Sequence, residues 1–153
     1  MQYLIWAGLL PACVVAALMI ARRPARMVWE ELHVDRARLQ FRRRREWLEA
    51  RFVGALLRAD EAEGRRWEDA RWHDEIVWAR DRQTRRLLAL VGVHFDPHPL
   101  DESQFPRHAT ALFEYRKGGW LAEGKRLDEI RPDEAFLRLH RFERVITPQS
   151  RRA

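Results

Sequence analysis

The sequence of 153 residues contains one cysteine, Cys13, so no disulfide can form within the chain. Its only serines are Ser103 and Ser150, and neither stands in the Gly-x-Ser-x-Gly pattern that presents a catalytic serine. The sequence also has no HExxH motif, no CxxC motif and no Gly-rich phosphate-binding loop. The chain therefore lacks the motifs by which several large enzyme classes are identified. We therefore expect a protein that is not an enzyme and that binds no cofactor.

Lysine is scarce as well: the chain has only Lys117 and Lys125, although its formal net charge is +6. Arginine therefore supplies nearly all of the positive charge. Between Arg22 and Trp47 there are nine arginines and four acidic residues, whereas the two signs nearly cancel in the rest of the chain. The basic character of the protein thus belongs to the first third of its sequence.

One long uncharged apolar run, from Tyr3 to Ala21, stands out against this charged background. As a helix it would reach roughly 28 Å, which is close to the thickness of the hydrocarbon core of a bilayer. Three basic residues, Arg22, Arg23 and Arg26, follow it and none precedes it. Residues 1–23 are therefore predicted to be a transmembrane anchor, with the N-terminus outside and the C-terminal domain in the cytoplasm.

Three alternatives to a retained anchor are less consistent with the run. A cleaved secretory signal could end after Ala17, but the run lacks a basic segment before it and stays apolar beyond that position. A lipoprotein site at Leu10-Pro11-Ala12-Cys13 would lie in the middle of the run instead of at its end. A buried core helix is the third alternative, although the run is long for one.

Residues 24–94 are predicted to form a helical hairpin or stalk. Apolar residues recur every seven positions in its first part, at Met27, Val34, Phe41, Leu48 and Ala55. Asp60 and Glu63 have the spacing of a helix-capping box, and Gly64 is a common helix terminator. Two antiparallel helices, 25–59 and 66–92, would meet at this turn, and one uninterrupted helix remains the alternative. Four tryptophans, Trp47, Trp67, Trp72 and Trp78, indicate that this region is packed.

The last third of the chain has a different pattern. Residues 95–108 form a proline-rich connector, residues 109–148 a small module, and residues 149–153 a tail. In the module, alternating residues on both sides of Lys117-Gly118-Gly119 predict a β-hairpin, Lys125 to Leu127 a third short strand, and Pro132 the start of a helix that ends at Pro148. Phe113 and Tyr115 are expected to face this helix and to meet Phe136, Leu139 and Phe142. The predicted fold class is therefore mainly α with a small α+β module at the C-terminus.

The densest basic run, Arg42-Arg43-Arg44-Arg45, is the first candidate contact site for an anionic partner. An upright helix would place it roughly 30 Å from a bilayer, beyond the Debye length of about 8 Å, so lipid contact would require a helix lying flat. The four arginines could instead be solvated and paired with neighbours such as Glu46 and Glu49. A protein partner or a nucleic acid are the other interpretations, since arginine beside Phe41 and Trp47 suits phosphate contact and base stacking.

A metal site is the other hypothesis that the sequence raises. His94, Asp96 and His98 place three ligand types alternately in an extended segment. No diagnostic zinc spacing accompanies them, so they are weak candidates and no metal is predicted.

The sequence thus favours a non-enzymatic, membrane-anchored protein that contacts the bilayer through residues 3–21 and uses its basic helical domain as a protein-interaction or scaffolding surface. A protein partner or self-association is expected. The alternative is a membrane-tethered nucleic-acid-binding protein that uses Arg42, Arg43, Arg44 and Arg45.

Overall fold

In the computed structural model, residues 32–96 and 106–146 are described. The chain divides into two compact units, Met1–Leu39 and Gln40–Ala153. Residues 32–39 of the first unit are helical, and within them Arg38 Nη1 lies 3.6 Å from the carboxylate of Asp35. The second unit contains the sheet and the sites described below.

The second unit begins with two helices and continues with an antiparallel sheet. Residues 40–43 are helical, and Arg44 interrupts the helix before α2 begins. The elements that follow are α2 (Arg45–Ala59), α3 (Glu61–Glu68), β1 (Arg71–Asp81), β2 (Leu87–His94), β3 (His108–Arg116), β4 (Gly119–Leu121), β5 (Arg126–Asp128), α4 (Glu134–Arg138) and β6 (Phe142–Arg144).

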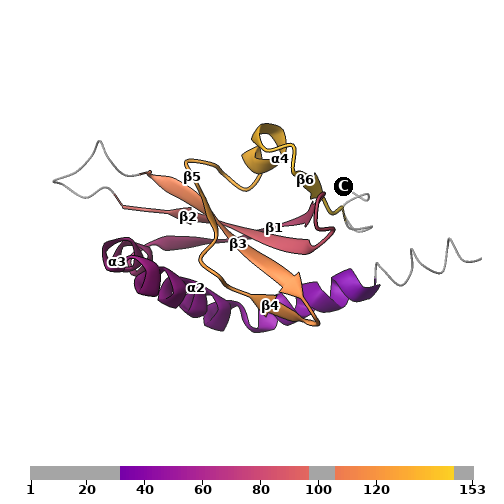
Figure 1. The fold of residues 1–153 in the computed structure, drawn as a ribbon, viewed down its shortest axis with the longest axis horizontal. Coiled ribbons are helices and arrows are strands. Elements are labelled where there is room, and N and C mark those ends of the chain that lie inside the picture. The colour runs from indigo at the N-terminus through magenta and orange to yellow at the C-terminus, as the bar shows by residue number, and fades with distance from the viewer. Residues whose placement is uncertain (1–31, 97–105, 147–153) are drawn as a thin grey trace, which may run out of the picture. The chain divides into compact units, whose positions relative to one another are not determined.

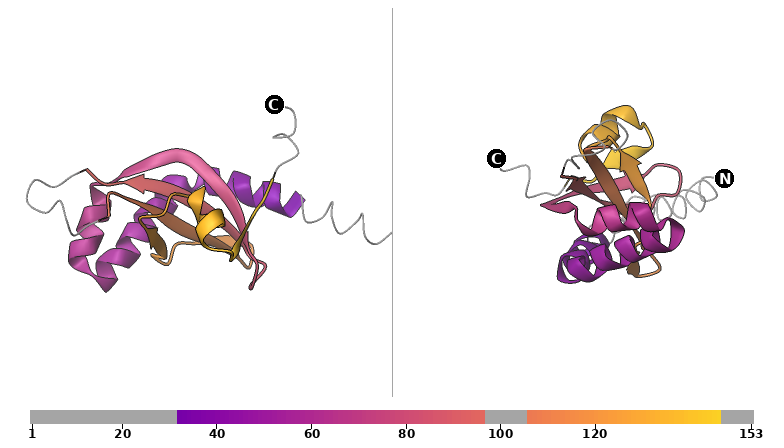
Figure 2. Two further views of the ribbon diagram at one scale, coloured as in Figure 1. Left: turned by 90° about the horizontal axis from the view of Figure 1, so that it is seen from above. Right: turned by 90° about the vertical axis from the view of Figure 1, so that its left-hand side faces the viewer.

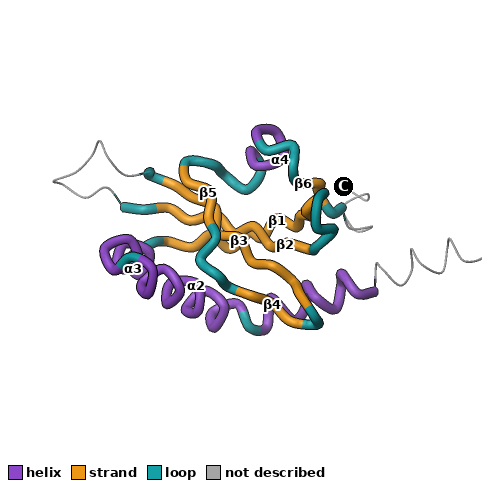
Figure 3. Tube along the Cα trace, in the orientation of Figure 1, coloured by secondary structure: helices purple, strands orange, loops and turns teal. Residues whose placement is uncertain are grey.

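The six strands form one sheet in the order β4-β3-β2-β1-β6, and β5 also pairs with β3 (Figures 1 and 3). All pairs are antiparallel. Strand β2 lies in the middle, and every residue from Leu87 to Val93 is buried. A continuous apolar run is what a strand covered on both faces requires, because both sets of alternating side chains then meet protein.

Helices α2 and α3 cover one face of the sheet, whereas α4 lies over the other (Figures 1 and 2). Phe41 and Phe52 project from the helical side, and each makes ring contacts with Phe113 of β3, at centroid distances of 5.2 and 5.4 Å. The buried rings between the helices and the sheet form what we call the aromatic layer: Phe41, Phe52, Trp67, Trp78, Phe113 and Trp120. Buried aromatic side chains contribute large apolar areas, so this layer is the main core of the unit.

The opposite face carries a second, aliphatic core beneath α4. Its buried residues are Val77, Ala79, Leu88, Leu90, Ala135 and Phe142. Leu112, Leu127, Ile130, Phe136 and Leu139 pack against it and are partly buried. Successive residues of β1, β2 and β3 therefore alternate between an aromatic layer and an aliphatic core.

A buried carboxylate holds the turn between β1 and β2. The side chain of Asp81 accepts hydrogen bonds from the backbone N–H groups of Gln83 (2.8 Å) and Thr84 (3.1 Å), and its Oδ2 pairs with Arg141 Nη2 at 2.6 Å. Burial raises the pKa of this carboxyl group, but these donors and the charge of Arg141 outweigh burial, so the pKa lies below its usual value. The charged form therefore ties the turn to the segment that leads into β6.

The prediction of a mainly α fold is wrong, because the structure has a six-stranded antiparallel sheet where a second helical arm was expected. Residues 66–92 contain the end of α3, then β1 and most of β2. Trp72, Ile76 and Ala79 have helical spacing, but a β-bulge in β1 shifts the register between Trp72 and Ile76 and breaks the alternation that marks a strand. Gly64 does not terminate a helix either, since it lies inside α3.

The predicted C-terminal module is correct in its hairpin but not in the extent of its helix or the face of Phe113. β3 and β4 pair across Lys117 and Gly118, both of which have positive φ. The expected helix from Pro132 comprises only α4, and β6 follows it. Phe113 lies in the aromatic layer, whereas its neighbour Leu112 packs on the α4 side, so the predicted register is wrong by one residue.

Within residues 32–96 and 106–146, no helix is long and apolar enough to cross a membrane. The single-pass membrane protein that the sequence predicts, with its N-terminus outside and its C-terminal domain in the cytoplasm, thus has no spanning helix among these residues. The predicted span from Tyr3 to Ala21 and the flanking residues Arg22, Arg23 and Arg26 lie outside the described residues.

Candidate functional site

The four consecutive arginines predicted as an anionic-partner site are divided by the fold. Arg42, Arg43 and Arg44 are exposed where the first helical segment ends. Arg45, the first residue of α2, is turned inward, and only 19% of its side chain is exposed. The predicted site therefore loses one member, because Arg45 has structural partners.

Arg45 holds the bulge of β1 in place. Its Nη1 donates to the carbonyl oxygen of Asp74 at 2.8 Å, its Nη2 donates to that of His73, and its Nε pairs with Glu49 at 2.6 Å. The bulge places three residues, 73–75, opposite Gly92 of β2, so their carbonyl groups depart from the regular ladder. A guanidinium can satisfy two such carbonyls at once because its donors form a planar fork.

A tryptophan of α2 that follows these arginines in the chain is also exposed. Half of Trp47 is exposed, and the guanidinium carbon of Arg51 lies 4.9 Å from the centroid of its ring. A guanidinium over an indole ring is a favourable cation–π arrangement. We call the exposed residues Arg42, Arg43, Arg44, Trp47 and Arg51 the basic surface.

The weak metal candidates are placed only in part. His94 ends β2 and is exposed, whereas the carboxylate of Asp96 pairs with Arg71 at 3.0 Å. His98 lies outside the described residues. Among the residues that the structure describes, no group of three or more His, Cys, Asp or Glu side chains could hold a metal ion. The structure therefore does not test the weak candidate set of His94, Asp96 and His98 as a whole.

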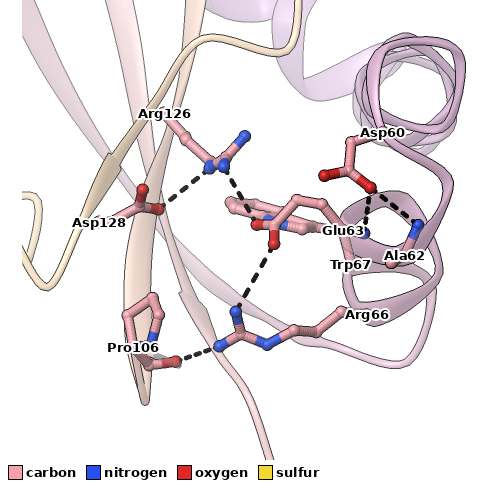
Figure 4. Close-up of polar contacts among 8 residues, drawn as sticks. All are labelled: Asp60, Ala62, Glu63, Arg66, Trp67, Pro106, Arg126 and Asp128. Atoms are coloured by element: carbon pink, nitrogen blue, oxygen red, sulfur yellow. Dashed lines mark hydrogen bonds and ion pairs between the residues drawn. The ribbon is translucent and has the colours of Figure 1, made fainter. Parts of the chain in front are cut away.

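A polar network around Glu63 connects α3 to the sheet (Figure 4). The Glu63 carboxylate accepts from the indole N–H of Trp67 at 2.9 Å and pairs with Arg126 of β5 at 3.3 Å and with Arg66 at 3.8 Å. Arg66 also donates to the carbonyl oxygen of Pro106 and lies over the ring of Phe95. Burial lowers the pKa of the Arg66 guanidinium, and the charge of Glu63 opposes that shift. Because each of these groups has partners within the fold, the network is structural.

A groove of about 820 Å³ opens on the α4 side of the sheet. Its lining comes from the bulged part of β1, the end of β2, the start of β3 and the segment before α4, and it includes His73, Gly92, His94, His108 and Pro132. We call it the Gly92 groove. Sequence reasoning missed it, since its histidines are far apart in the chain and only strand pairing brings them to one face.

No known protein family matches the chain, and neither does any curated protein or solved structure. Functional inference therefore rests on the geometry of the basic surface and of the Gly92 groove.

Proposed function

We propose that the second unit is a non-enzymatic binding module that contacts an acidic partner protein through the basic surface. The observation that supports this proposal is the half-exposed Trp47 with Arg51 stacked over it. Tryptophan and arginine are the residues most enriched among the energetic hot spots of protein interfaces, where the surrounding contacts exclude water.

The charges near Trp47 in the chain are mostly positive and favour an acidic partner, with Glu46 the exposed acidic residue next to it. Arg42, Arg43 and Arg44 are exposed three to five positions before it, and none of them has a carboxylate within 4.0 Å among the described residues. Uncommitted guanidinium groups gain most from a partner that supplies carboxylates. Self-association through this surface is less favourable, because a second copy carries the same net charge of +6.

Nucleic acid is the other anionic partner that the sequence suggests. Nucleic-acid-binding surfaces without base readout combine an extended basic groove with several aromatic platforms. The basic surface offers one exposed tryptophan, and Arg45 is bound to the backbone of β1 instead of facing solvent. A compact protein contact suits this geometry better.

Site-specific photo-crosslinking of the full chain in cells tests the proposal. A photoreactive phenylalanine replaces Trp47, and the same residue at Leu137 of α4, which is 78% exposed, is the matched control. The expected result is a discrete protein adduct at position 47 that is absent at position 137. Charge reversal by Arg43→Glu and Arg44→Glu should abolish it.

Four outcomes contradict the proposal: equal adducts at both positions, an adduct that survives charge reversal, an adduct with nucleic acid, or an adduct of twice the mass of the chain. The third would support the nucleic-acid alternative. The fourth would identify self-association instead of an acidic partner.

A further inference from the structure

We propose that the Gly92 groove is a binding site for a small organic phosphate, a ligand that pairs a phosphate group with an apolar body. This inference concerns the α4 side of the sheet and is independent of the basic surface.

The groove has the size and the walls of a ligand site. Its volume of about 820 Å³ falls in the range of about 300–1,000 Å³ that is typical of small-molecule pockets. Gly92 forms part of its floor, and a Cβ atom at that position would lie 3.4 Å from His73 Cδ2 and from the ring of Pro132. His73 and Pro132 therefore flank the position where a side chain would stand, and glycine at residue 92 leaves no Cβ between them.

Strand pairing gathers three imidazoles at this groove. Phe95 N donates to Arg107 O at 3.0 Å, so the neighbouring opposite residues, His94 and His108, form a pair without mutual backbone hydrogen bonds. The Cβ atoms of such a pair lie about 4.5–5.5 Å apart on one face of a sheet. His73 also lines the groove, from the bulge opposite Gly92. None of the three imidazoles has a hydrogen-bond partner among the described residues.

The arginines of the lining add positive charge that the fold does not use. Arg71 pairs with Asp96, but neither Arg107 nor Arg131 has a carboxylate within 4.0 Å in the described part of the chain. Of the acidic lining residues, Asp133 pairs with Arg144, and the side chain of Asp74 is fully exposed to solvent near Arg45. Glu75 is exposed and is the remaining carboxylate.

This arrangement suits a phosphate better than a carboxylate. Donors from β1, β2, β3 and the segment before α4 line the groove, and the three terminal oxygens of a phosphate monoester can accept hydrogen bonds from several such donors at once. A planar carboxylate is matched best by the fork of one arginine. Val77 and Pro132 provide apolar lining for the rest of the ligand. The anchoring of the bulge by Arg45 keeps His73 in position without the ligand, which lowers the entropic cost of binding.

The test is a titration of the full chain with phenyl phosphate at pH 7, followed by two-dimensional amide NMR. We expect saturable binding with a Kd below about 1 mM. The shifts should be confined to residues of the groove such as Gly92, His94 and His108. Phenol, which lacks the phosphate, should not shift these signals, and inorganic phosphate should bind more weakly than phenyl phosphate.

Two variants and one control assign the contacts. Arg131→Gln and His108→Gln should each weaken phenyl phosphate binding at least about tenfold, whereas Arg82→Gln, an exposed residue of the β1–β2 turn, should leave it unchanged. The amide spectrum of each variant shows whether its fold is retained. Absence of binding, equal binding by phenol, full affinity in both groove variants, or shifts centred on Arg42 to Arg44 would overturn the proposal.

Discussion

Adjacent residues at the start of α2 have opposite roles although their side chains are identical. Arg44 is exposed, whereas the guanidinium of Arg45 binds two carbonyl groups of the β1 bulge and the carboxylate of Glu49. The side chain of Glu49 is only 17% exposed, and its carboxylate lies 2.6 Å from Arg45 Nε. At the scale of single residues, the burial of an arginine side chain and the direction in which it points decide whether it stabilises the fold or remains available to a partner.

Arg45→Ala is therefore expected to lower the free energy of unfolding by about 2–3 kcal/mol, because it removes charge-assisted hydrogen bonds and leaves the half-buried carboxylate of Glu49 without this ion-pair partner. Arg44→Ala, one position earlier, should change it by less than about 0.5 kcal/mol, as exposed substitutions usually do. Urea unfolding of the two variants measures the difference. Similar losses in both would show that Arg45 does not support the bulge.

At the scale of elements, close packing between α2 and α3 explains why residue 64 is glycine. The sequence alone suggests a different reason, namely that a helix ends there. Asp60 caps α3 by accepting from the backbone N–H groups of Ala62 and Glu63, as the predicted capping spacing implies. Gly64, however, lies within α3, where a Cβ would come within 2.5 Å of Leu57 Cγ and 2.6 Å of its Cα. The glycine is needed because the two helices approach each other there, not because a helix ends.

Gly64→Ala should consequently destabilise the protein by about 1–3 kcal/mol, since the Cα of Leu57 cannot move aside as a flexible side chain can. Gly54→Ala in α2 is the matched control, because the nearest atom to its added Cβ is the end of Arg58 at 3.6 Å. That change should stabilise the protein by up to about 1 kcal/mol through helix propensity. Thermal unfolding of both variants distinguishes the two effects, and a gain in both would refute close packing at Gly64.

At the scale of the whole second unit, the sheet separates two cores of different character. The aromatic layer lies between the sheet and α2 and α3, and the aliphatic core lies under α4. The alternation of β2 and β3 assigns Phe113 to the first and Leu112 to the second. Truncations within one core should therefore be energetically coupled, whereas truncations in different cores should have additive effects.

A double-mutant cycle tests the separation. Phe113→Ala alone should cost about 3–5 kcal/mol, as a fully buried aromatic truncation does. Combined with Phe41→Ala it should show a coupling energy of about 0.5–1.5 kcal/mol, because the two rings lie 5.2 Å apart. With Phe136→Ala on the other face the effects should add within about 0.5 kcal/mol. Stronger coupling to Phe136 than to Phe41 would restore the register predicted from the sequence.

Some features of this protein follow from short stretches of sequence alone. The hairpin at Lys117-Gly118, the short strand after Gly124 and the cap at Asp60 all depend on neighbouring residues, and the structure contains each of them. The four tryptophans predict packing from Trp47 to Trp78, and three of them make ring contacts in the fold, whereas half of Trp47 is exposed. These signals are local because positive φ and capping involve only a few consecutive residues.

The tertiary structure decided the rest. Residues 71–94 have apolar spacings that a helix or a strand could satisfy, and they are strands because β1 and β2 pair with each other and with β6 and β3. The inward turn of Arg45 depends on carbonyl groups that lie 28 and 29 positions later in the chain. The Gly92 groove likewise joins residues from Arg71 to Asp133. Such contacts depend on which distant segments become neighbours in the folded sheet, and that cannot be read from the spacing of residues along the chain.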